Sequence, residues 1–487
     1  MNINLSSRCA GKRWKEWKEI VSIPLVTFSL SFFLCTEASG AQTADSMRQS
    51  TETSSHIIKA DSDPANVHSE RYTLAGAIDY ALQNNPKVRI AAKDIEVESY
   101  GIDAAQAERM PRIDFGSGAS RYRFPMPLTP PVISGPFGAG LELPDYSRNI
   151  YEAAGSFRLP IFKGGRLYRA VLVAELKKAV AQDNFITSKH DLIYNLSSVF
   201  FKIAELEKLL VATDGNVKQL EAHKRDVELF FRTGAVAYLD LLKTDVRLAY
   251  AIEQRLSVKN NLESARELLK TLMGMDDMET RIEIVYNEAS SPGHLSLEES
   301  LAKALAQRPE YKAVTKKKKI FEERVKIAQG KWLPDVYVGG EYGGKAGDNF
   351  AFKENWFFGA RLSIPVFDGG LISAEVNRER TELQKVLEEE RSLKLAITRE
   401  VRDAYLNITY ARERTEVARK TIDSAKENVR IEGLKYQTGA GTITDYLDAQ
   451  TDLLRTEADY YRAFFDEEIA RAFLRKAVGD EKYQQEV

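Results

Sequence analysis

The chain has 487 residues, of which 44% are hydrophobic, and a formal net charge of -2. This length allows about two or three ordinary domains or one very elongated one. A slightly acidic chain is a poor nucleic-acid binder, so we expect no nucleic acid among its partners. Both cysteines, Cys9 and Cys35, lie near the N-terminus, so we expect neither disulfides nor thiol chemistry in the remaining chain.

Residues 1–41 have the pattern of a secretory signal peptide. Basic residues precede the apolar run IVSIPLVTFSLSFFLC, and the small-residue stretch EASGAQ follows it, so we expect cleavage after Ala41. Lipidation of Cys35 is the weaker alternative, because two bulky residues precede it. Residues 42–71 are expected to form a flexible N-terminal segment. No later stretch approaches roughly 18 consecutive apolar residues, so any membrane insertion must use strands.

The rest of the chain contains an internal duplication with an offset of 205 residues. The matching stretches are LPIFKGGR at 159–166 with IPVFDGGL at 364–371, and RTGA at 232–235 with QTGA at 437–440. Upstream the offset becomes 223, because the first half has an additional Pro/Gly-rich loop that can be neither a helix nor a central strand. We therefore predict two structural repeats, 72–290 and 291–487.

Each repeat is predicted to contain a helix, two strands, a very long helix and a final helix. In the first repeat these elements fall at about 74–109, 111–122, 150–160, 166–231 and 239–273. In the second repeat they fall at about 297–332, 334–343, 354–365, 371–436 and 444–478. At 1.5 Å per residue each long helix would span roughly 100 Å, and the two shorter helices laid end to end would match it. We expect each long helix to be flanked by two stacked shorter ones.

Apolar spacing supports this packing. Steps of four and three separate the residues of one stripe on the first long helix: Leu192, Leu196, Val199, Ile203, Leu206 and Leu210. Such spacing is typical of a coiled-coil seam, although ordinary helix packing would also produce it. The corresponding face of the second long helix has smaller residues: Ile397, Val401, Ala404, Ile408 and Ala411.

The four strand-like runs alternate apolar and polar residues over about nine or ten positions, which suits a tilted transmembrane strand as well as a half-buried soluble one. Four strands cannot close a barrel, and open edges are not tolerated in lipid, so the strands would have to join an oligomeric barrel. The expected fold is mostly α with a small β part: long helices packed as coiled coils, and four strands per chain that contribute to a transmembrane β-barrel.

The duplicated plan, the IPVFDGG and LPIFKGG junctions and the turn TGAGTITDYLDAQTDLL resemble the TolC-like outer-membrane efflux proteins (outer membrane factors) of Gram-negative bacteria, over about residues 72–480. The resemblance implies a homotrimer with a twelve-stranded barrel in outer-membrane lipid and a helical tunnel across the periplasm. It implies no catalysis and no cofactor. It also implies a periplasmic adaptor (membrane fusion protein) and an inner-membrane pump of the RND or ABC type. The cargo would be small toxic molecules, with type I protein secretion as the alternative.

Two aspartates follow the second turn. Asp445 and Asp448 are three residues apart, so they lie one turn apart on one face of a helix. The resemblance places them at the positions of a ring that surrounds the closed entrance of the channel. Three copies would present six carboxylates, which would attract cations and disfavour anions.

The resemblance also assigns a gate lock and two tips. Asp240 matches an aspartate that helps to hold the closed state, and Tyr436 matches a tyrosine on the partner side of that lock. Gly441 stands where the best-described lock of the family has an arginine, so we expect a less firmly closed resting gate. Gly234 and Gly439 mark the two turns, which are expected to be the adaptor-docking tips.

Other interpretations of these residues remain open. The paired carboxylates could be the acid and base of a glycosidase, which would need a shaped cleft and a raised pKa, or they could simply cap a helix start. No metal site is expected, because these five histidines lack ligand spacing: His56, His68, His190, His223 and His294. The KKKK run at 316–319 is interpreted as a solvated helix face. A periplasmic coiled-coil scaffold without a pore would explain the helices but not the strands.

Overall fold

The computed structural model describes residues 69–134, 140–277, 279–286 and 296–480. The predicted signal peptide and most of the segment 42–71 lie outside the described residues. Within the described residues, none of the helices combines the length and the apolar character needed to cross a membrane.

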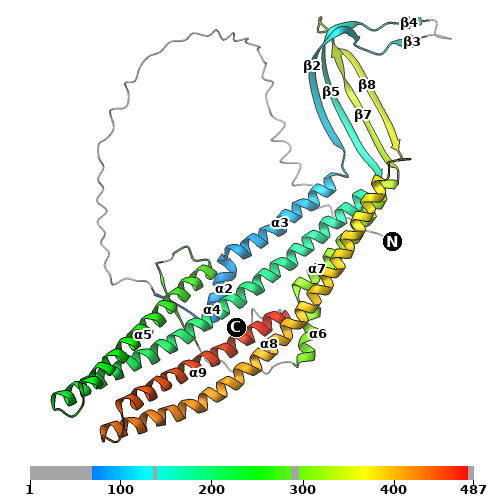
Figure 1. Cartoon of the computed structure of the whole chain (residues 1–487). Coiled ribbons are helices and arrows are strands. Elements are labelled where there is room, and N and C mark those ends of the chain that lie inside the picture. Colours follow the sequence, from blue (N-terminus) through cyan, green and yellow to red (C-terminus); the bar gives the residue numbers. More distant parts are fainter. Residues whose placement is uncertain (1–68, 135–139, 278, 287–295, 481–487) are drawn as a thin grey trace, which may run out of the picture. The chain divides into compact units, whose positions relative to one another are not determined.

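The described residues of the first repeat form four helices, which Figure 1 labels. They are α2 (Leu74–Asn84), α3 (Pro86–Ala107), α4 (Arg166–Arg232) and α5 (Tyr238–Met273). The prediction of a single helix at 74–109 is therefore wrong, because α2 and α3 are separate helices. Asn85 has an extended backbone, with φ -63° and ψ 124°, because the residue before a proline avoids the helical region. Its side chain then accepts hydrogen bonds from the backbone N–H groups of Lys87 and Val88 and caps α3, whose first residue is Pro86.

The second repeat has the same arrangement. Its helices are α6 (Leu297–Gln307), α7 (Pro309–Gln329), α8 (Leu371–Gln437) and α9 (Ile443–Val478). The helix predicted at 297–332 is again divided by a proline, because Arg308 is extended before Pro309. The long helices α4 and α8 have 67 residues each, which corresponds to roughly 100 Å.

In each repeat, one glycine lies where the final helix ends against the end of the first short helix. Gly274 and Gly479 each end a helix with a φ of 72°. A Cβ at Gly274 would lie 2.7 Å from the carbonyl oxygen of Asn84, and one at Gly479 would lie 3.0 Å from the Cα of Arg308. Both positions therefore need glycine for its conformation and for its size, at the points where α2 and α6 end.

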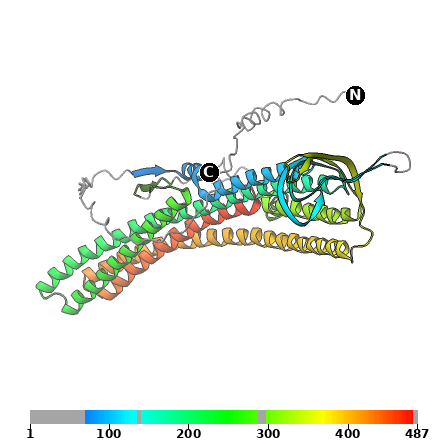
Figure 2. The same cartoon turned by 90° about the horizontal axis from the view of Figure 1, so that it is seen from above.

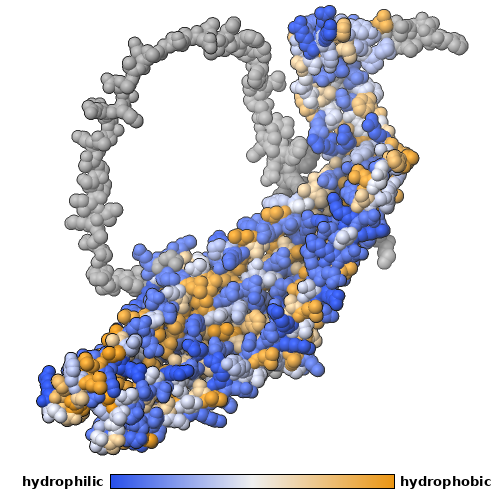
Figure 3. All heavy atoms as spheres, viewed as in Figure 1, coloured by the Kyte–Doolittle hydropathy of each residue, from blue (hydrophilic) through white to orange (hydrophobic). Residues whose placement is uncertain are grey.

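The four predicted strands form one antiparallel sheet in the order β2-β5-β7-β8. They are β2 (Arg112–Pro127), β5 (Tyr146–Lys163), β7 (Asp335–Ala346) and β8 (Lys353–Ser363). The pairing of β5 with β7 joins the two repeats, and β2 and β8 are the edge strands. Every residue of β2 and β8 is exposed. Figure 3 shows an apolar patch where β8 leads into α8, and exposed Ile364, Val366 and Phe367 lie in this segment.

Two further strand pairs do not correspond to any predicted strand. The short strands β3 (Val132–Ser134) and β4 (Gly140–Glu142) pair with each other inside the Pro/Gly-rich loop of the first repeat. The strands β1 (Ser69–Tyr72) and β6 (Arg281–Ile284) form a parallel pair beside the helices. Each of these strands has only three or four residues, which is too short for an alternating pattern to be recognised.

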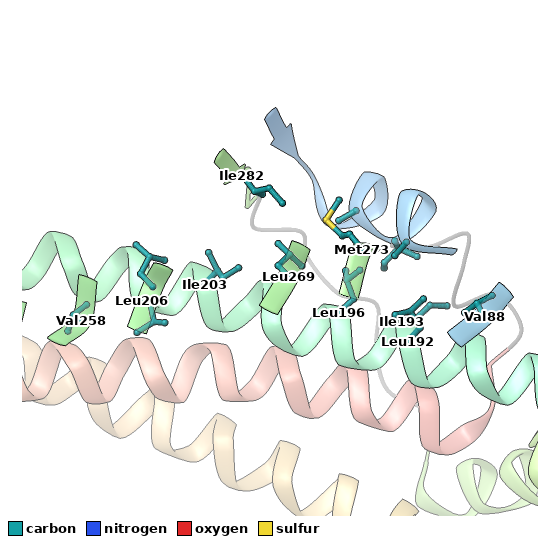
Figure 4. Close-up of a cluster of buried hydrophobic side chains, with 14 residues drawn as sticks. Val88, Leu192, Ile193, Leu196, Ile203, Leu206, Val258, Leu269, Met273 and Ile282 are labelled. Carbon is teal, nitrogen blue, oxygen red and sulfur yellow. The ribbon is translucent and has the colours of Figure 1, made fainter. Parts of the chain in front are cut away.

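Each long helix packs against two shorter helices of its own repeat, as the helix lengths predicted: α4 against α3 and α5, and α8 against α7 and α9. The helix α4 also packs against α7 and α9 of the second repeat. The predicted stripe on α4 lies in the main core, where Leu196 and Ile203 are fully buried beside Leu269, Met273 and Ile282 (Figure 4). Burying each such side chain contributes about 1.5–3 kcal/mol. On α8 the predicted smaller face is buried along its whole length.

The interpretation of the lysine run of α7 as a solvated face holds only in part, because Lys319 is exposed whereas the other three lysines are partly buried and paired. Lys316 pairs with the buried Asp183 of α4 at 2.6 Å. On the other side, α8 supplies Glu389 to Lys317 at 2.6 Å and Glu390 to Lys318 at 3.1 Å. The run therefore bridges the long helices of the two repeats.

Candidate functional site

The two duplicated turns have nearly the same backbone. The first turn joins α4 to α5, the second joins α8 to α9, and both lie at the same end of the helices (Figures 1 and 2). Gly234 has a φ of 76° and Gly439 a φ of 75°. No described atom lies within 4 Å of a Cβ built at either glycine, so each is required for its conformation and not for its size.

A cleft of about 710 Å³ lies between the two turns and brings together four of the predicted site residues. Asp240, Tyr436, Gly439 and Gly441 all line it, together with Lys243 and other residues of both turns. The cleft is shallow and open, and its walls are backbone and mixed side chains. It is therefore a junction between two helical hairpins and not an enclosed substrate pocket.

Asp445 caps the start of α9. The Asp445 backbone N–H donates to the Thr442 hydroxyl at 3.2 Å, and that hydroxyl donates to the Asp445 carboxylate at 2.7 Å. The Thr442 backbone N–H also donates to this carboxylate at 3.4 Å, which completes a capping box. The capping interpretation therefore holds for Asp445. Its side chain is exposed and negative at the positive end of the helix dipole.

Asp448 lies one turn further along α9 and has a different partner. Its carboxylate accepts a hydrogen bond from the Arg247 guanidinium of α5 at 2.6 Å, and 58% of its side chain is exposed. The neighbouring contact also crosses between the hairpins, because the Lys243 ammonium donates to the Thr444 hydroxyl at 3.0 Å. The two aspartates thus share a helix face but not a local role.

The predicted lock residues lie close together without a direct hydrogen bond. The Tyr436 hydroxyl is buried and has no hydrogen-bond partner among the described residues. Burial raises the pKa of Tyr436, and the charges of Asp240 and Asp226 raise it further. Asp240 lies in the first turn of α5, and its backbone carbonyl accepts a hydrogen bond from the Thr244 hydroxyl at 2.8 Å.

Gly441 is restricted by packing. A Cβ at this position would lie 2.9 Å from the Cβ of Lys435, at the end of α8. The Gly441 N–H also donates to the carbonyl of Lys435 at 3.0 Å. An arginine in place of Gly441 would therefore require the second turn to shift, in addition to supplying a guanidinium.

His223 is a member of this site that the sequence analysis did not select. It comes from α4 and packs edge-on against Tyr436 at 5.4 Å and Tyr446 at 5.0 Å between ring centroids. Its Nε2 is buried and has no partner among the described residues. Burial lowers the pKa of His223, and the charge of Asp226 partly opposes that effect. No spacing in the sequence links a histidine in α4 with tyrosines of the other repeat.

The described residues contain no group of three or more His, Cys, Asp or Glu side chains that could hold a metal ion. Among the charged residues of the site, the sequence analysis selected neither Lys243 nor Arg247. Their partners lie about 200 residues away in the sequence, so only the folded chain brings them together.

Comparisons with known proteins agree with this architecture. The family model described as "Outer membrane efflux protein" matches residues 77–275 and 301–480. The outer membrane protein TolC of Escherichia coli is 20% identical over 432 residues, which cover 84% of this chain and 83% of TolC. The toluene efflux pump outer membrane protein TtgI of Pseudomonas putida is 23% identical over 419 residues, which cover 83% of this chain and 85% of TtgI.

Among solved structures, the CmeC outer membrane channel of Campylobacter jejuni matches with a TM-score of 0.72 at 20% identity, over 83% of this chain and 85% of CmeC. The family model matches both repeats and the turns between their helices. This chain therefore belongs to the outer membrane efflux protein family, whose members are channel proteins of the outer membrane and not enzymes.

Proposed function

We propose that this protein is the outer-membrane component of a tripartite export system, through which an inner-membrane pump and a periplasmic adaptor expel small molecules. The observation that carries the proposal is the position of the sheet relative to the turns. Only two residues separate β5 from α4, and α4 then continues for 67 residues to the first turn. The strands and the charged turns therefore lie at opposite ends of a helix of roughly 100 Å.

The sheet supports assembly as a homotrimer. Its edge strands β2 and β8 carry exposed apolar side chains, among them Phe115 at 77% and Phe358 at 70% exposure. Three copies would supply twelve strands, enough to close a barrel and remove the open edges. The exposed aromatic and aliphatic residues would then contact lipid.

The turns support docking and gating. Gly234 and Gly439 lie on exposed turns, so an adaptor could contact them, and the same end of the chain carries Asp445 and Asp448. In a trimer these two aspartates would place carboxylates around the entrance and favour cations there. Tyr436, Asp240 and Gly441 line the junction at which the two hairpins would have to separate for opening.

Small-molecule cargo is the favoured assignment. The name of the relative TtgI refers to toluene efflux, which concerns a small apolar molecule. Type I protein secretion remains the second candidate, because the fold alone does not identify the cargo. Identification of the pump and adaptor that co-purify with the channel would distinguish the two.

Channel activity can be tested with the full-length protein purified from outer membranes. We expect a trimer band that dissociates on heating and ion conductance in planar lipid bilayers. A periplasmic scaffold would give neither, and that result would reject the proposal.

The entrance assignment is tested with Asp445→Asn combined with Asp448→Asn. Asparagine keeps a hydrogen-bond acceptor for Thr442 but removes the charge. We expect altered conductance and a weaker preference for cations. The control is Glu427→Gln, which removes an acidic charge from α8 at a residue paired with Arg430 of the same helix. Equal conductance and selectivity in the wild type and the double variant would refute the assignment of Asp445 and Asp448 to the entrance.

A further inference from the structure

Two arginines lie directly opposite each other on neighbouring strands of the four-stranded sheet. Arg112, the first residue of β2, is the register partner of Arg158 in β5. The next residues along the two strands, Ile113 and Phe157, are partners on the other face of the sheet. Like charges directly opposite each other in an antiparallel pair are destabilising. A negative charge placed between the two guanidinium groups would remove this cost.

The chain itself does not supply that charge to both arginines. The Arg112 guanidinium donates to the Asp114 carboxylate at 2.9 Å. Within the part of the chain that the structure describes, Arg158 has no ion pair and no side-chain hydrogen bond. Because β5 lies between β2 and β7, both strands beside Arg158 belong to the same chain. In a trimer another copy would add a strand to an edge of the sheet, so it would not place a strand beside Arg158.

The other strands leave space in front of Arg158. Its register partner on β7 is Gly339, whose own partner on β8 is Gly359, so neither neighbour adds a side chain at this level. A further cation, Arg361, lies two residues along β8 from Gly359, on the same face. The nearest acid on this face of β7 is Glu341, two residues beyond Gly339, and it forms no ion pair with Arg158. This part of the face is therefore open and rich in cations.

The face that carries the arginines would line the lumen of the proposed barrel. The opposite face is apolar: Ile113 and Phe115 are each 77% exposed, and Phe358 is 70% exposed. In a transmembrane barrel the apolar face contacts lipid and the polar face borders the lumen. Arg112 begins its strand soon after α3 ends, and β5 leads into α4, so the arginines lie at the end of the sheet next to the helices.

We propose that Arg112 and Arg158 form a binding site for anions in the lumen, and that its ligands are small solutes with phosphate or carboxylate groups. This inference rests on the proposed channel function, which leaves the charge of the cargo open. A guanidinium presents a planar set of N–H donors that matches the paired oxygens of a phosphate or a carboxylate. A bound anion would replace the repulsion between the two arginines by a favourable contact with each of them.

The site would give the channel opposite charge preferences at its two ends. Asp445 and Asp448 lie near the turns, whereas Arg112 and Arg158 lie at the other end of the long helices, where the sheet begins. The Arg112 side chain is 80% exposed, so water screens the site and binding remains weak. Weak binding suits a conduit, because a solute must leave the site as readily as it enters.

The experiment uses full-length trimeric channels in planar bilayers at low ionic strength, where charge effects are least screened. Inorganic tripolyphosphate is the probe, and it is added on the side opposite the turns. We expect it to reduce the conductance of the wild type. Arg158→Gln should raise the half-blocking concentration roughly ten-fold, as for the loss of a hydrogen bond to a charged group. Arg158→Lys keeps the charge without the planar donors and should give an intermediate value.

The matched control is Arg121→Gln, which removes the same charge from β2. Arg121 lies an odd number of residues from Arg112, so it is on the opposite face, and its register partner is Asn149. We expect the half-blocking concentration of this control to equal that of the wild type. An equal rise in Arg121→Gln and Arg158→Gln would place the anion on the lipid-facing side and overturn the lumen site.

Binding can also be measured without conductance, because a ligand of the folded state raises the melting temperature. Tripolyphosphate should raise the melting temperature of the detergent-solubilised trimer for the wild type and for Arg121→Gln, but not for Arg158→Gln. Without the probe, Arg158→Gln should melt no lower than the wild type, because the repulsion from Arg112 is gone.

The outcomes separate this inference from the channel function. If the wild type conducts but tripolyphosphate does not block it, or if it blocks Arg158→Gln at the wild-type concentration, the anion site is overturned while the channel function stands. Absence of conductance in the wild type would instead overturn the proposed function, and the melting temperatures would still test the site. Should Arg158→Gln fail to give the heat-modifiable trimer band, Arg112→Gln decides: block at the wild-type concentration in that variant would overturn the site.

Discussion

The two duplicated turns share a backbone but differ in the chemistry of the helices that follow them. Their glycines have φ values within one degree of each other, 76° and 75°. The second turn leads into α9 through the capping box of Thr442 and Asp445, whereas the first leads into α5 after Ala237, which has no side chain that could cap. The duplication thus retained the geometry of the turn, while substitutions gave one hairpin cations and the other carboxylates.

Because of this difference, the two hairpins of one chain complement each other. A perfect duplicate would place aspartates on both α5 and α9, and like charges facing each other are destabilising. Lys243, at the position that corresponds to Asp448, instead supplies a donor for Thr444. The following predictions separate what the repeats share from what distinguishes them, from the largest expected effect to the smallest.

The largest effect is expected where the repeats share a buried glycine. Gly274→Ala should lower the free energy of unfolding by up to about 3 kcal/mol, because alanine is strained at positive φ and its Cβ would lie 2.7 Å from the Asn84 carbonyl oxygen. Gly234→Ala has the same backbone strain without that clash, so about 1 kcal/mol is expected. Melting temperatures of the detergent-solubilised trimers measure both. Equal losses of stability in Gly274→Ala and Gly234→Ala would mean that the close approach to Asn84 adds nothing to the destabilisation.

The second effect tests the cap that distinguishes the turns. Thr442→Ala removes the capping hydroxyl of α9 and should destabilise the start of this helix by about 1 kcal/mol. Faster hydrogen exchange of the first amides of α9 would show it, and Thr442→Ser, which keeps the hydroxyl, is the matched control. Unchanged exchange in the alanine variant would show that Asp445 does not depend on this cap for its position.

A smaller effect is expected when the cap is transferred to the first turn. Ala237 has an extended backbone, with φ -78° and ψ 152°, and Asp240 occupies the third helical position. Ala237→Ser therefore reproduces the pattern of Thr442 and Asp445 and should stabilise the start of α5 by about 0.5–1 kcal/mol. Hydrogen exchange of the first amides of α5 measures it, with Ala237→Val as the control that adds bulk without a cap. No difference between the two variants would contradict the equivalence of the turns.

The long helices could be predicted closely from the sequence, but other parts could not. The glycine pairs and the TG turns interrupt a continuous helical pattern, so the predicted 166–231 became Arg166–Arg232 in the structure. The breaks before Pro86 and Pro309 were missed because helical periodicity resumes immediately after each proline. Pairing is the harder problem: the sequence shows a lysine run, but its partners come from two other helices.

The same limit applied to the candidate site. Asp445 and Asp448 could be located from the turn and its duplicate, because both signals are local in the sequence. The partner of Asp445 is local, because Thr442 lies three residues away. The partner of Asp448 could not be derived from local spacing, because Arg247 lies in the other repeat. Local spacing thus identifies which charges lie near the turn, and only the folded chain shows which of them are neutralised.

The smallest expected effect concerns pH and His223, which connects the two hairpins by packing edge-on against Tyr436 and Tyr446. Burial lowers the pKa of His223 in the folded chain, against the partial opposition of Asp226, so the folded state favours the neutral imidazole. The unfolded chain takes up a proton below its ordinary pKa of about 6.5, so the stability of this junction should fall as the pH falls below that value. Hydrogen exchange at the ends of α8 and α9, corrected for intrinsic rates, should therefore be faster near pH 5.5 than near pH 7.5.

His223→Phe should remove this dependence at the turns and leave any effect of the buried His190, whose pKa is also lowered, further along α4. A pH dependence at the turns that persists in His223→Phe would assign it to the carboxylates and leave His223 with a packing role only.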